Sequence, residues 1–453
     1  MDITKRFHYI GISGDGMSAI AQFHAKSGGI ISGSDRAFDN GEKSDVRDKL
    51  EKLGISIFPQ DGSAVKKGCD YIVASTAIES TVPDFAEAEK QKIEILHRSD
   101  MLAHFVSQRN TIAIGGTSGK STVVAMVFEI LSAARKSPSL ITGGKLVQLI
   151  EQGYIGNAWT GKSDILVIEA DESDGTIVKY GPETGVVLNL SKDHKEEAVC
   201  AEMFAKFREN TCTNFITGED NNLEFLQENS FIFGFGETAD IKAEHIELHP
   251  AHSTFTIEKV NFKIPMPGIH NVQNAAAAIA VCLKAGVSLA EMTKPLAEYH
   301  GVHRRFQSLG KAAGVEVIDD FAHNPAKIAA TIKAAQIRGS RVIAVFQPHG
   351  FYPTRFMWDE FVESFAEVLR PQDILWMQEI YYAGGTTQKD FSASDLVKDI
   401  AEKCSNVYFS PDRKYLLDRL SKETKAGDII LVMGARDETL SDFARDILSI
   451  LKK

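Results

Sequence analysis

Residues Ile112-Ala-Ile-Gly-Gly-Thr-Ser-Gly-Lys-Ser-Thr122 join a short apolar run to a helix-like segment, Val123 to Leu131. This order predicts a strand, a glycine-rich loop and a helix. Such a loop turns backbone N–H groups toward a polyphosphate, and the N-terminus of the helix adds partial positive charge. In this pattern Lys120 reaches the β- and γ-phosphates, and the Ser121 hydroxyl binds Mg²⁺.

The loop is a shortened variant of the P-loop. The strict pattern has a glycine five residues before the Gly-Lys pair, where this chain has Ile114, so the match is to Gly-Thr-x-Gly-Lys-[Ser/Thr]. A glycine-rich turn can merely connect two elements, but Gly-Lys-Ser-Thr directly after a strand favours a loop that binds ATP or a relative. The residues expected to bind the nucleotide here are Gly116, Thr117, Ser118, Gly119, Lys120, Ser121 and Thr122.

Bulk composition excludes several classes of protein. The net charge of −11 argues against nonspecific binding to nucleic acids or anionic membranes, which requires a basic face. No apolar run reaches the ~20 residues of a membrane span, and the N-terminus has no signal-peptide pattern. The five cysteines lie far apart without a Cys-x-x-Cys motif, which is typical of a reducing cytoplasm. We therefore expect a cytoplasmic protein.

The 453 residues predict about three domains, at ~150 residues each. Residues 1–107 and 306–453 alternate strand-like and helical runs, which predicts parallel sheets with crossover helices. Residues 108–305 contain the phosphate loop and form the central unit. Within it, short alternating runs over 231–264 suggest an antiparallel insertion. The predicted class is α/β with three domains.

A second glycine-rich turn, Gly11-x-x-Gly14-x-Gly16, follows the strand-like run Phe7 to Ile10, and Asp35 ends the next strand. The arrangement is similar to a dinucleotide fingerprint, in which the turn binds pyrophosphate and the acid binds a ribose hydroxyl. Its spacing is not Gly-x-Gly-x-x-Gly, so a tight turn without a ligand is the alternative. An NAD-dependent dehydrogenase would use this turn but would leave the central loop unexplained.

Acidic and polar side chains follow two strands of the central unit. Glu169-Ala-Asp-Glu-Ser-Asp174 comes after the apolar strand Ile165 to Ile168, where carboxylates would hold Mg²⁺; a solvated acidic loop is the alternative. Asp193-His194 follows the strand Gly185 to Leu188. Histidine is an uncommon Mg²⁺ ligand, so its chemistry alone favours hydrogen bonding or capping for His194.

Three further polar groups lie at element ends. Asn271-x-x-Asn274 opens an Ala-rich helix and could donate to phosphate or nucleobase, or cap the helix. His303-Arg-Arg-Phe306 lies near the proposed domain junction, where arginine could clamp phosphate or pair with a surface acid. Asp319-Asp320 ends a strand and could bind a ribose or an adenine amine, or cap the next helix.

Taken in order, these motifs resemble the Mur ligases of peptidoglycan synthesis. The resemblance spans nearly the whole chain and rests on Gly11–Ser18, Gly33–Asp35, Gly116–Thr122, Glu169–Asp174, Asp193–His194, His270–Asn274, His303–Phe306, Asp319–Pro325 and Phe346–His349. It implies three domains: residues 1–107, Rossmann-like, for a UDP-sugar; residues 108–305, a P-loop ATPase; and residues 306–453, Rossmann-like, for an amino acid.

The resemblance also implies a reaction. An ATP-dependent amide ligase would join L-alanine to the lactyl carboxylate of UDP-N-acetylmuramate through an acyl phosphate, with ATP and Mg²⁺ as cofactors. Attachment of a recycled L-Ala-γ-D-Glu-diaminopimelate tripeptide to the same sugar nucleotide is the alternative, as is a paralogue with another acceptor. The enzyme would be a cytoplasmic monomer or homodimer.

Roles carry over position by position. The implied catalytic residues are Lys120, Glu169, His194 and Arg305, with Ser121, Glu169 and His194 at the metal. This reverses the interpretation of His194 as a capping residue. ATP would also be contacted by Asn271, Asn274, Asp319 and Asp320. The UDP-sugar and the other substrate would be contacted by Gly14, Gly16, Met17, Ser18, Asp35, His323 and His349.

The chain departs from the family pattern at several positions. Ser118 and Ser121 stand where members that attach alanine usually have His and Thr, a change that other family members share. Gly350 follows Phe346-Gln-Pro-His349 where an Arg is expected, and other C-terminal motifs also drift. Because these last changes fall in the amino-acid domain, the identity of the acceptor rests on the fewest matching residues.

Overall fold

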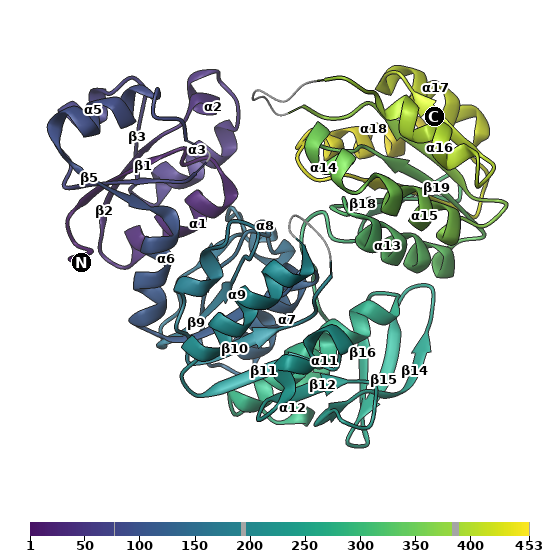
Figure 1. The fold of residues 1–453 in the computed structure, drawn as a ribbon, viewed down its shortest axis with the longest axis horizontal. Helices are drawn as coiled ribbons and strands as arrows, with labels where there is room; N and C mark the ends of the chain where they lie inside the picture. The colour runs from purple at the N-terminus through teal and green to yellow at the C-terminus, as the bar shows by residue number, and fades with distance from the viewer. Residues whose placement is uncertain (77, 192–195, 383–388, 453) are drawn as a thin grey trace. The chain divides into compact units, whose positions relative to one another are not determined.

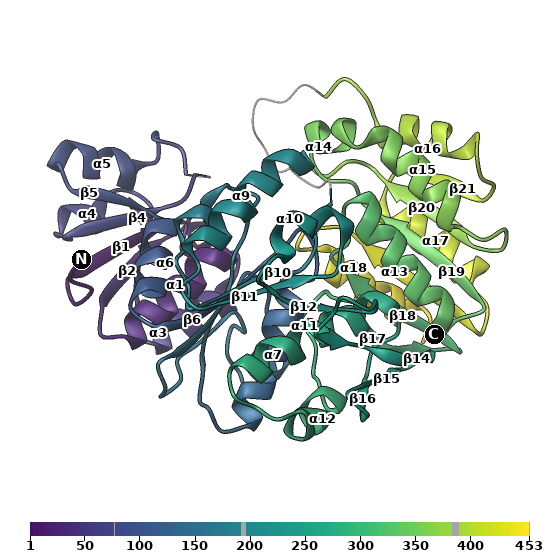
Figure 2. The ribbon, with the colours of Figure 1, turned by 60° about the horizontal axis from the view of Figure 1, so that its bottom comes forward.

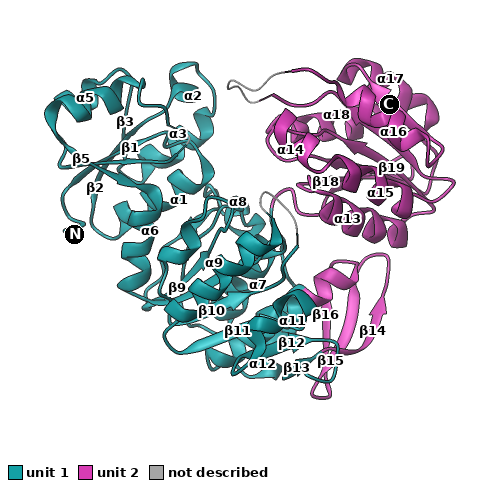
Figure 3. Ribbon diagram, in the orientation of Figure 1, with its two compact units in different colours: residues 1–242, 274–302 teal, residues 243–273, 303–453 magenta. Residues whose placement is uncertain are grey.

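The computed structural model describes residues 1–76, 78–191, 196–382 and 389–452. These residues form four sheets with intervening helices (Figures 1 and 2). They divide into two compact units (Figure 3): one contains residues 1–242 and 274–302, the other residues 243–273 and 303–453. The predicted α/β class is confirmed. Within the described ranges, no helix has the length and apolarity to span a membrane.

The N-terminal sheet has five strands, all paired in parallel, in the order β3-β2-β1-β4-β5. Its strands are β1 (Arg6–Ile10), β2 (Ile30–Ser34), β3 (Ser56–Phe58), β4 (Tyr71–Ala74) and β5 (Glu94–His97). The strand order reverses beside β1, and ligands bind in the crevice at such a reversal. Helix α1 (Asp15–Lys26) follows β1, and α6 (Arg98–Ser107) follows β5. The expected parallel sheet with crossover helices is confirmed.

A buried histidine joins α1 to this sheet. His24 Nδ1 accepts from the Tyr9 hydroxyl at 2.9 Å, and its Nε2–H donates to the carbonyl of Ile3 at 2.7 Å. Both partners suit the neutral ring, and burial lowers the pKa of His24 to about 4.

This buried ring predicts an acid-sensitive fold. Between pH 6.5 and 4 the unfolded chain protonates His24 and the folded chain does not, so stability falls as pH falls, by about 2–3 kcal/mol across the window. Urea unfolding at pH 7 and pH 5 measures the loss. His24→Gln keeps both hydrogen-bonding functions without titrating, so it should lose less stability over this range. An equal loss in the two proteins would contradict the assignment.

The central sheet has eight strands in the order β13-β12-β11-β10-β6-β9-β7-β8, parallel except for β8. Its strands are β6 (Asn110–Gly115), β7 (Ser139–Ile141), β8 (Ala158–Trp159), β9 (Ile165–Glu169), β10 (Thr184–Val187), β11 (Asn214–Gly218), β12 (Phe231–Gly234) and β13 (Ile241–Lys242). Helix α7 (Lys120–Ala133) follows β6. Its residues 121–131 are all buried, as expected for a helix that is apolar on every side.

The predicted antiparallel insertion is confirmed in part. Strands β14 (Glu244–Leu248), β15 (Ser253–Ile257) and β16 (Val260–Ile264) form an antiparallel sheet. The predicted insertion begins at residue 231, but the first strand of that range, β12, is not antiparallel. It pairs in parallel with β11 and extends the central sheet. The sequence Phe-Ile-Phe-Gly of β12 is continuously apolar, which is typical of parallel strands rather than of alternating, half-exposed ones.

The C-terminal sheet has six strands in the order β17-β18-β22-β19-β20-β21. They are β17 (Gln307–Ala312), β18 (Val315–Asp320), β19 (Arg341–Phe346), β20 (Ile374–Gln378), β21 (Val407–Ser410) and β22 (Asp428–Met433). All pair in parallel except β17, which is antiparallel to β18. Buried residues of β18, β19 and β22 pack with α17 (Arg413–Glu423) and α18 (Leu440–Ile450) in one apolar cluster.

Candidate active site

The glycine-rich loop lies between β6 and α7, as predicted. Gly116 has φ 131° and Gly119 has φ 83°, a region that favours glycine. A Cβ on Gly119 would lie 2.4 Å from Asn274 Oδ1, and one on Gly116 would lie 3.0 Å from the backbone nitrogen of Leu188. Both backbone shape and close packing therefore require glycine at these two positions.

Asn189, which follows β10, holds the loop in place. Its Oδ1 accepts from the Thr117 hydroxyl at 3.0 Å and from the Ser118 N–H at 2.9 Å, and its Nδ2 donates to the Ser118 carbonyl at 3.1 Å. One amide thus makes three of the bonds that shape the loop. Sequence analysis did not single out this residue, although its place directly after a strand of the same sheet was a usable signal.

Removing the Asn189 amide is expected to weaken nucleotide binding. Asn189→Ala leaves the hydroxyl of Thr117 and the backbone of Ser118 without that partner, so the loop loses its fixed shape. We expect a rise of about 30- to 150-fold in the Kd of ATP, since two or three hydrogen bonds are worth ~1 kcal/mol each. Titration calorimetry measures it. Asn210→Ala, which removes a bond to the Val178 carbonyl elsewhere, is the control, and equal Kd values for the two variants would contradict the role.

Lys120 is held by two carboxylates. Its Nζ lies 2.6 Å from Glu172 Oε2 and 3.3 Å from Asp171 Oδ1, and only 12% of its side chain is exposed. Burial alone would lower the pKa of Lys120, but the two negative charges outweigh burial and raise it. Burial likewise opposes ionisation of Asp171, yet the Lys120 charge and bonds from Ser173 lower its pKa to about 2. Lys120 is therefore a fixed cation at the start of α7.

Glu169, the last residue of β9, faces the same helix terminus. It accepts from the Ser121 hydroxyl at 3.0 Å, the Thr142 hydroxyl at 2.7 Å and the Gly143 N–H at 3.0 Å. The structure thus brings together Ser121 and Glu169, two of the three predicted metal ligands. His194, the third, lies outside the described residues.

The donor set suits Mg²⁺, which prefers oxygen ligands and is usually bound by one or two carboxylates together with substrate phosphates. Ser121 and Glu169 provide a hydroxyl and a carboxylate beside the loop. Among the residues that the structure describes, no group of three His, Cys, Asp or Glu side chains could hold a metal alone. The Ser121 hydroxyl and the Glu169 carboxylate are oxygen ligands of the kind that Mg²⁺ shares with substrate phosphates.

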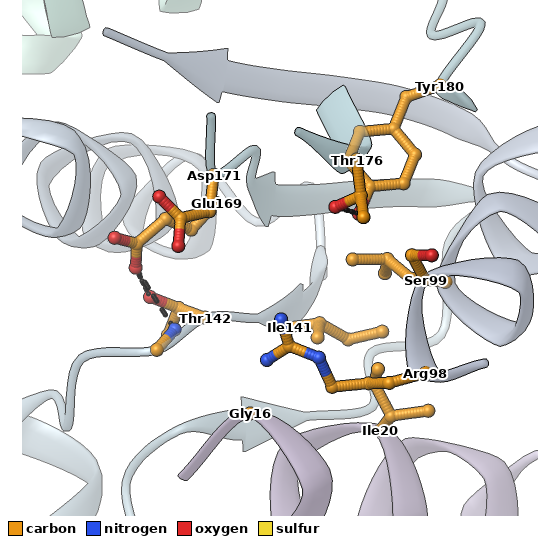
Figure 4. Close-up of a pocket in the computed structure, with 12 residues that line it drawn as sticks. Gly16, Ile20, Arg98, Ser99, Ile141, Thr142, Glu169, Asp171, Thr176 and Tyr180 are labelled. Carbon is orange, nitrogen blue, oxygen red and sulfur yellow. Dashed lines mark hydrogen bonds between the residues drawn. The ribbon is translucent and has the colours of Figure 1, made fainter. Parts of the chain in front are cut away.

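A cavity of about 90 Å³ opens beside Glu169 (Figure 4). Its lining includes Gly16 of α1, Arg98 of α6, Thr142, Glu169 and Tyr180. The predicted sugar-nucleotide turn and the predicted metal ligand thus share one cavity, as the sequence-based assignment of both to one reaction requires. Arg98 was not anticipated, because nothing in its local sequence distinguishes it.

Other residues predicted for the sugar nucleotide have structural contacts. Asp35 accepts from the Ser13 N–H at 2.8 Å and caps α2 (Arg36–Asp39) through the Ala37 N–H. Gly14 is the N-cap of α1. Met17 and Ser18 are buried in α1, and neither lines the cavity. Substrate contacts for these four residues stay predictions.

Helix α11 (Ile269–Lys284) carries the two predicted asparagines. Asn274 lies beside the loop, with its Oδ1 against Gly119. Asn271 donates from Nδ2 to the Pro267 carbonyl at 2.7 Å, a bond to the segment just before its own helix. Only Asn274 is therefore seen next to the loop, and nucleotide contacts by either stay predictions.

In the C-terminal unit, the acidic pair that ends β18 already has hydrogen-bond partners. Asp319 accepts from Arg304 Nε at 3.3 Å, and Asp320 accepts from the Phe306 N–H at 2.6 Å and the Ala322 N–H at 2.7 Å. Arg304 is buried and also donates to the Gly434 carbonyl at 2.6 Å. These contacts fix the backbone around the pair, and ATP contacts by Asp319 and Asp320 stay predictions.

Arg304 and Arg305 both face the Phe321 ring, with their guanidinium carbons 5.2 Å and 4.7 Å from its centre, a cation–π contact in each case. Arg304 is buried, whereas Arg305 is partly exposed. The role of Arg305 at the γ-phosphate stays a prediction.

His323 and His349 also come together, with ring centres 5.1 Å apart, and both are buried. Beside them, Gly350 has φ 73° and donates to the Tyr381 carbonyl at 2.9 Å. Side chains rarely adopt this φ, so the backbone here explains why glycine replaces the expected arginine. Substrate contacts by His323 and His349 stay predictions.

Comparison with known proteins decides the family. Residues 6–110 match the Mur ligase family catalytic domain, residues 114–282 the Mur ligase middle domain, and residues 304–436 the Mur ligase glutamate ligase domain. A UDP-N-acetylmuramate–L-alanine ligase of Geobacter sulfurreducens is 34% identical over 454 residues, which cover 95% of each chain. The chain belongs to the Mur ligase family. The resemblance noted from its motifs is confirmed, and so is the class of enzyme, an ATP-dependent ligase.

Solved Mur ligases share the fold over almost the whole chain. A UDP-N-acetylmuramate–alanine ligase from Thermotoga maritima is 25% identical, with a TM-score of 0.80 over 98% of each chain. A murein peptide ligase from Psychrobacter arcticus is 20% identical, with a TM-score of 0.68 over 99% of each chain, a likeness of fold alone. The predicted Mur ligase architecture is confirmed, whereas domain boundaries after residues 107 and 305 stay predictions.

Proposed function

We propose that this Mur ligase joins L-alanine to the lactyl carboxylate of UDP-N-acetylmuramate, with ATP and Mg²⁺, as a step of peptidoglycan synthesis. The observation that carries the proposal is the meeting of Lys120, Ser121 and Glu169 at the start of α7, where Glu169 also lines the cavity. It occurs in a chain 34% identical, over 95% of its length, to a ligase named for these substrates.

In the first step, a carboxylate oxygen of the sugar nucleotide bonds to the γ-phosphorus of ATP. The bond from that phosphorus to the β,γ-bridging oxygen breaks, which gives an acyl phosphate and ADP. Lys120 and the N–H groups at the start of α7 would stabilise the charge on the transferred phosphoryl group. Ser121 and Glu169 would hold Mg²⁺, which, when bound, neutralises charge between the two anions.

In the second step, the amine nitrogen of the acceptor bonds to the acyl carbon and forms a tetrahedral intermediate. The bond from that carbon to the phosphate oxygen then breaks, and inorganic phosphate leaves while the nitrogen gives up a proton. Phosphorylation is necessary because a free carboxylate has no adequate leaving group. The energy of one ATP bond thus produces one amide.

L-Alanine is the acceptor that the comparisons favour. Several relatives that are 31–34% identical and cover about 95% of the chain are named for L-alanine, whereas likeness to the murein peptide ligase is one of fold. Because ATP and UDP-sugars are cytoplasmic metabolites, we place the reaction in the cytoplasm. A monomer or homodimer stays the expectation for the assembly.

Phosphate release tests the acceptor. The full chain is mixed with ATP, Mg²⁺ and UDP-N-acetylmuramate, and L-alanine, L-serine, glycine or L-Ala-γ-D-Glu-diaminopimelate is added in turn. Turnover with L-alanine, at least about 10-fold faster than with the other acceptors, supports the proposal. Turnover with the tripeptide alone would instead assign the enzyme to recycling of cell-wall peptides. The absence of turnover with all four would reject both.

A further inference from the structure

The cavity beside Glu169 has walls of opposite charge. Glu169 and Asp171 lie on one side and the guanidinium of Arg98 extends from the other, as Figure 4 shows. The acidic side is where Mg²⁺ and the γ-phosphate are expected. A substrate carboxylate that attacks this phosphate must therefore approach from the side of Arg98.

Arg98 is held by a bond that can be exchanged. Its Nη2 donates to Asp174 Oδ2 at 2.9 Å, and 30% of its side chain is exposed. The other oxygen of Asp174 accepts from the Thr176 N–H at 3.0 Å and the Thr176 hydroxyl at 2.6 Å. Asp174 thus keeps two partners if the arginine moves to a ligand, which lowers the cost of release.

Gly16 makes room for this arginine. A Cβ on Gly16 would lie 2.1 Å from Arg98 Nη1, although the backbone φ of Gly16 is not positive. A side chain at this position would therefore push the guanidinium away, whereas glycine leaves Arg98 in its place.

We propose that Arg98 binds the lactyl carboxylate of the sugar nucleotide and makes the enzyme select sugars that carry this acid. The inference rests on the proposed function. A guanidinium can bind a carboxylate through two parallel N–H bonds, which fixes the orientation of the acid as well as its position. The cavity is lined by Gly16 of the turn predicted for the sugar nucleotide as well as by Glu169, so an acid bound by Arg98 there would lie beside the predicted metal ligand.

Two sugar nucleotides separate this role from a structural one. UDP-N-acetylglucosamine lacks the lactyl acid of UDP-N-acetylmuramate but is otherwise the same, so the ratio of their Kd values, measured by calorimetry with Mg²⁺, reports recognition of the acid. Arg98→Met should weaken binding of UDP-N-acetylmuramate by about 10- to 100-fold, the worth of a charged hydrogen-bond pair. Binding of UDP-N-acetylglucosamine should change less than about 2-fold.

Arg109→Met is the matched control. Arg109 also pairs with an aspartate, Asp164, and is also 30% exposed, but it does not line the cavity. This variant should prefer UDP-N-acetylmuramate over UDP-N-acetylglucosamine as strongly as the unmodified chain does. Gly16→Ala, which displaces the guanidinium and leaves its charge, should lower the preference in the same direction as Arg98→Met.

The outcomes are distinct. An Arg98→Met protein that keeps the preference for UDP-N-acetylmuramate, or that loses both ligands equally, overturns the proposal. If the unmodified chain binds neither sugar nucleotide, the proposed function itself fails, and the inference fails with it. Loss of the preference alone, in Arg98→Met and not in Arg109→Met, supports the assignment.

Discussion

Lys120→Met is expected to lower the rate of ADP formation by at least about 1,000-fold. The ammonium lies at the start of α7 between Glu172 and Asp171, where it would meet the γ-phosphate, and loss of a cation at a transferring phosphoryl group has effects of this size. Steady-state ADP release with saturating ATP, UDP-N-acetylmuramate and L-alanine measures the change.

The same change leaves the buried carboxylate of Glu172 and the partly exposed one of Asp171 without their cation, so folding must be tested separately. Binding of UDP-N-acetylmuramate should stay within about 2-fold of the unmodified chain. The double variant Lys120→Met, Glu172→Gln removes one of the two negative charges and should be as inactive. Lys206→Met, which removes an exposed lysine paired with Glu209, is the control. Normal turnover by Lys120→Met would reject the phosphate loop as the reaction site.

Glu169→Gln is expected to lower turnover by about 100-fold or more and to raise the Mg²⁺ concentration needed for half-maximal rate. The carboxylate accepts from Ser121, Thr142 and the Gly143 N–H. An amide keeps one acceptor oxygen, loses the negative charge that a cation needs, and turns an NH₂ group toward these donors. Turnover measured over a range of Mg²⁺ concentrations tests both effects.

The control for this change is Glu209→Gln, on the exposed face of α9 (Glu197–Asn210), which should leave rate and Mg²⁺ dependence unchanged. A Glu169→Gln protein with lower rate but the same Mg²⁺ dependence would show that Glu169 only positions its neighbours. Unchanged activity at low Mg²⁺ would place the metal elsewhere.

Local patterns were sufficient for much of the fold and for the centre of the site. The loop at Gly116–Gly119 could be predicted because glycine, a flanking strand and a helix start are all local signals. The meeting of Ser121 with Glu169 also followed, since Glu169 ends β9 and the loop that leads to Ser121 begins at the end of the neighbouring parallel strand β6.

Contacts between distant segments that no motif or strand order links could not be predicted. Arg98 meets Asp174 across 76 residues, and no spacing or periodicity relates the two. Asn189 fixes a loop 71–72 residues earlier in the chain. Such partners are set by how helices pack on sheets, which sequence patterns specify only coarsely.

The orientations of the neighbouring residues Arg304 and Arg305 also could not be predicted from the sequence. Both guanidinium groups lie over the ring of Phe321, but Arg304 is buried against Asp319 and Arg305 is partly exposed. Both Arg304 and Phe306 have positive φ. Which of two adjacent arginines faces inward depends on this turn of the backbone. The motif alone therefore identified the pair but could not predict the buried partner of Arg304.

Transfer of oxygen from substrate to phosphate tests the central claim most directly. UDP-N-acetylmuramate labelled with ¹⁸O in its lactyl carboxylate is turned over with ATP, Mg²⁺ and L-alanine, and the released phosphate is analysed by mass spectrometry. Attack of the carboxylate on the γ-phosphorus predicts one ¹⁸O atom in each phosphate. Phosphate without ¹⁸O, with amide formed, would contradict an acyl phosphate and with it the mechanism built on Lys120 and Glu169.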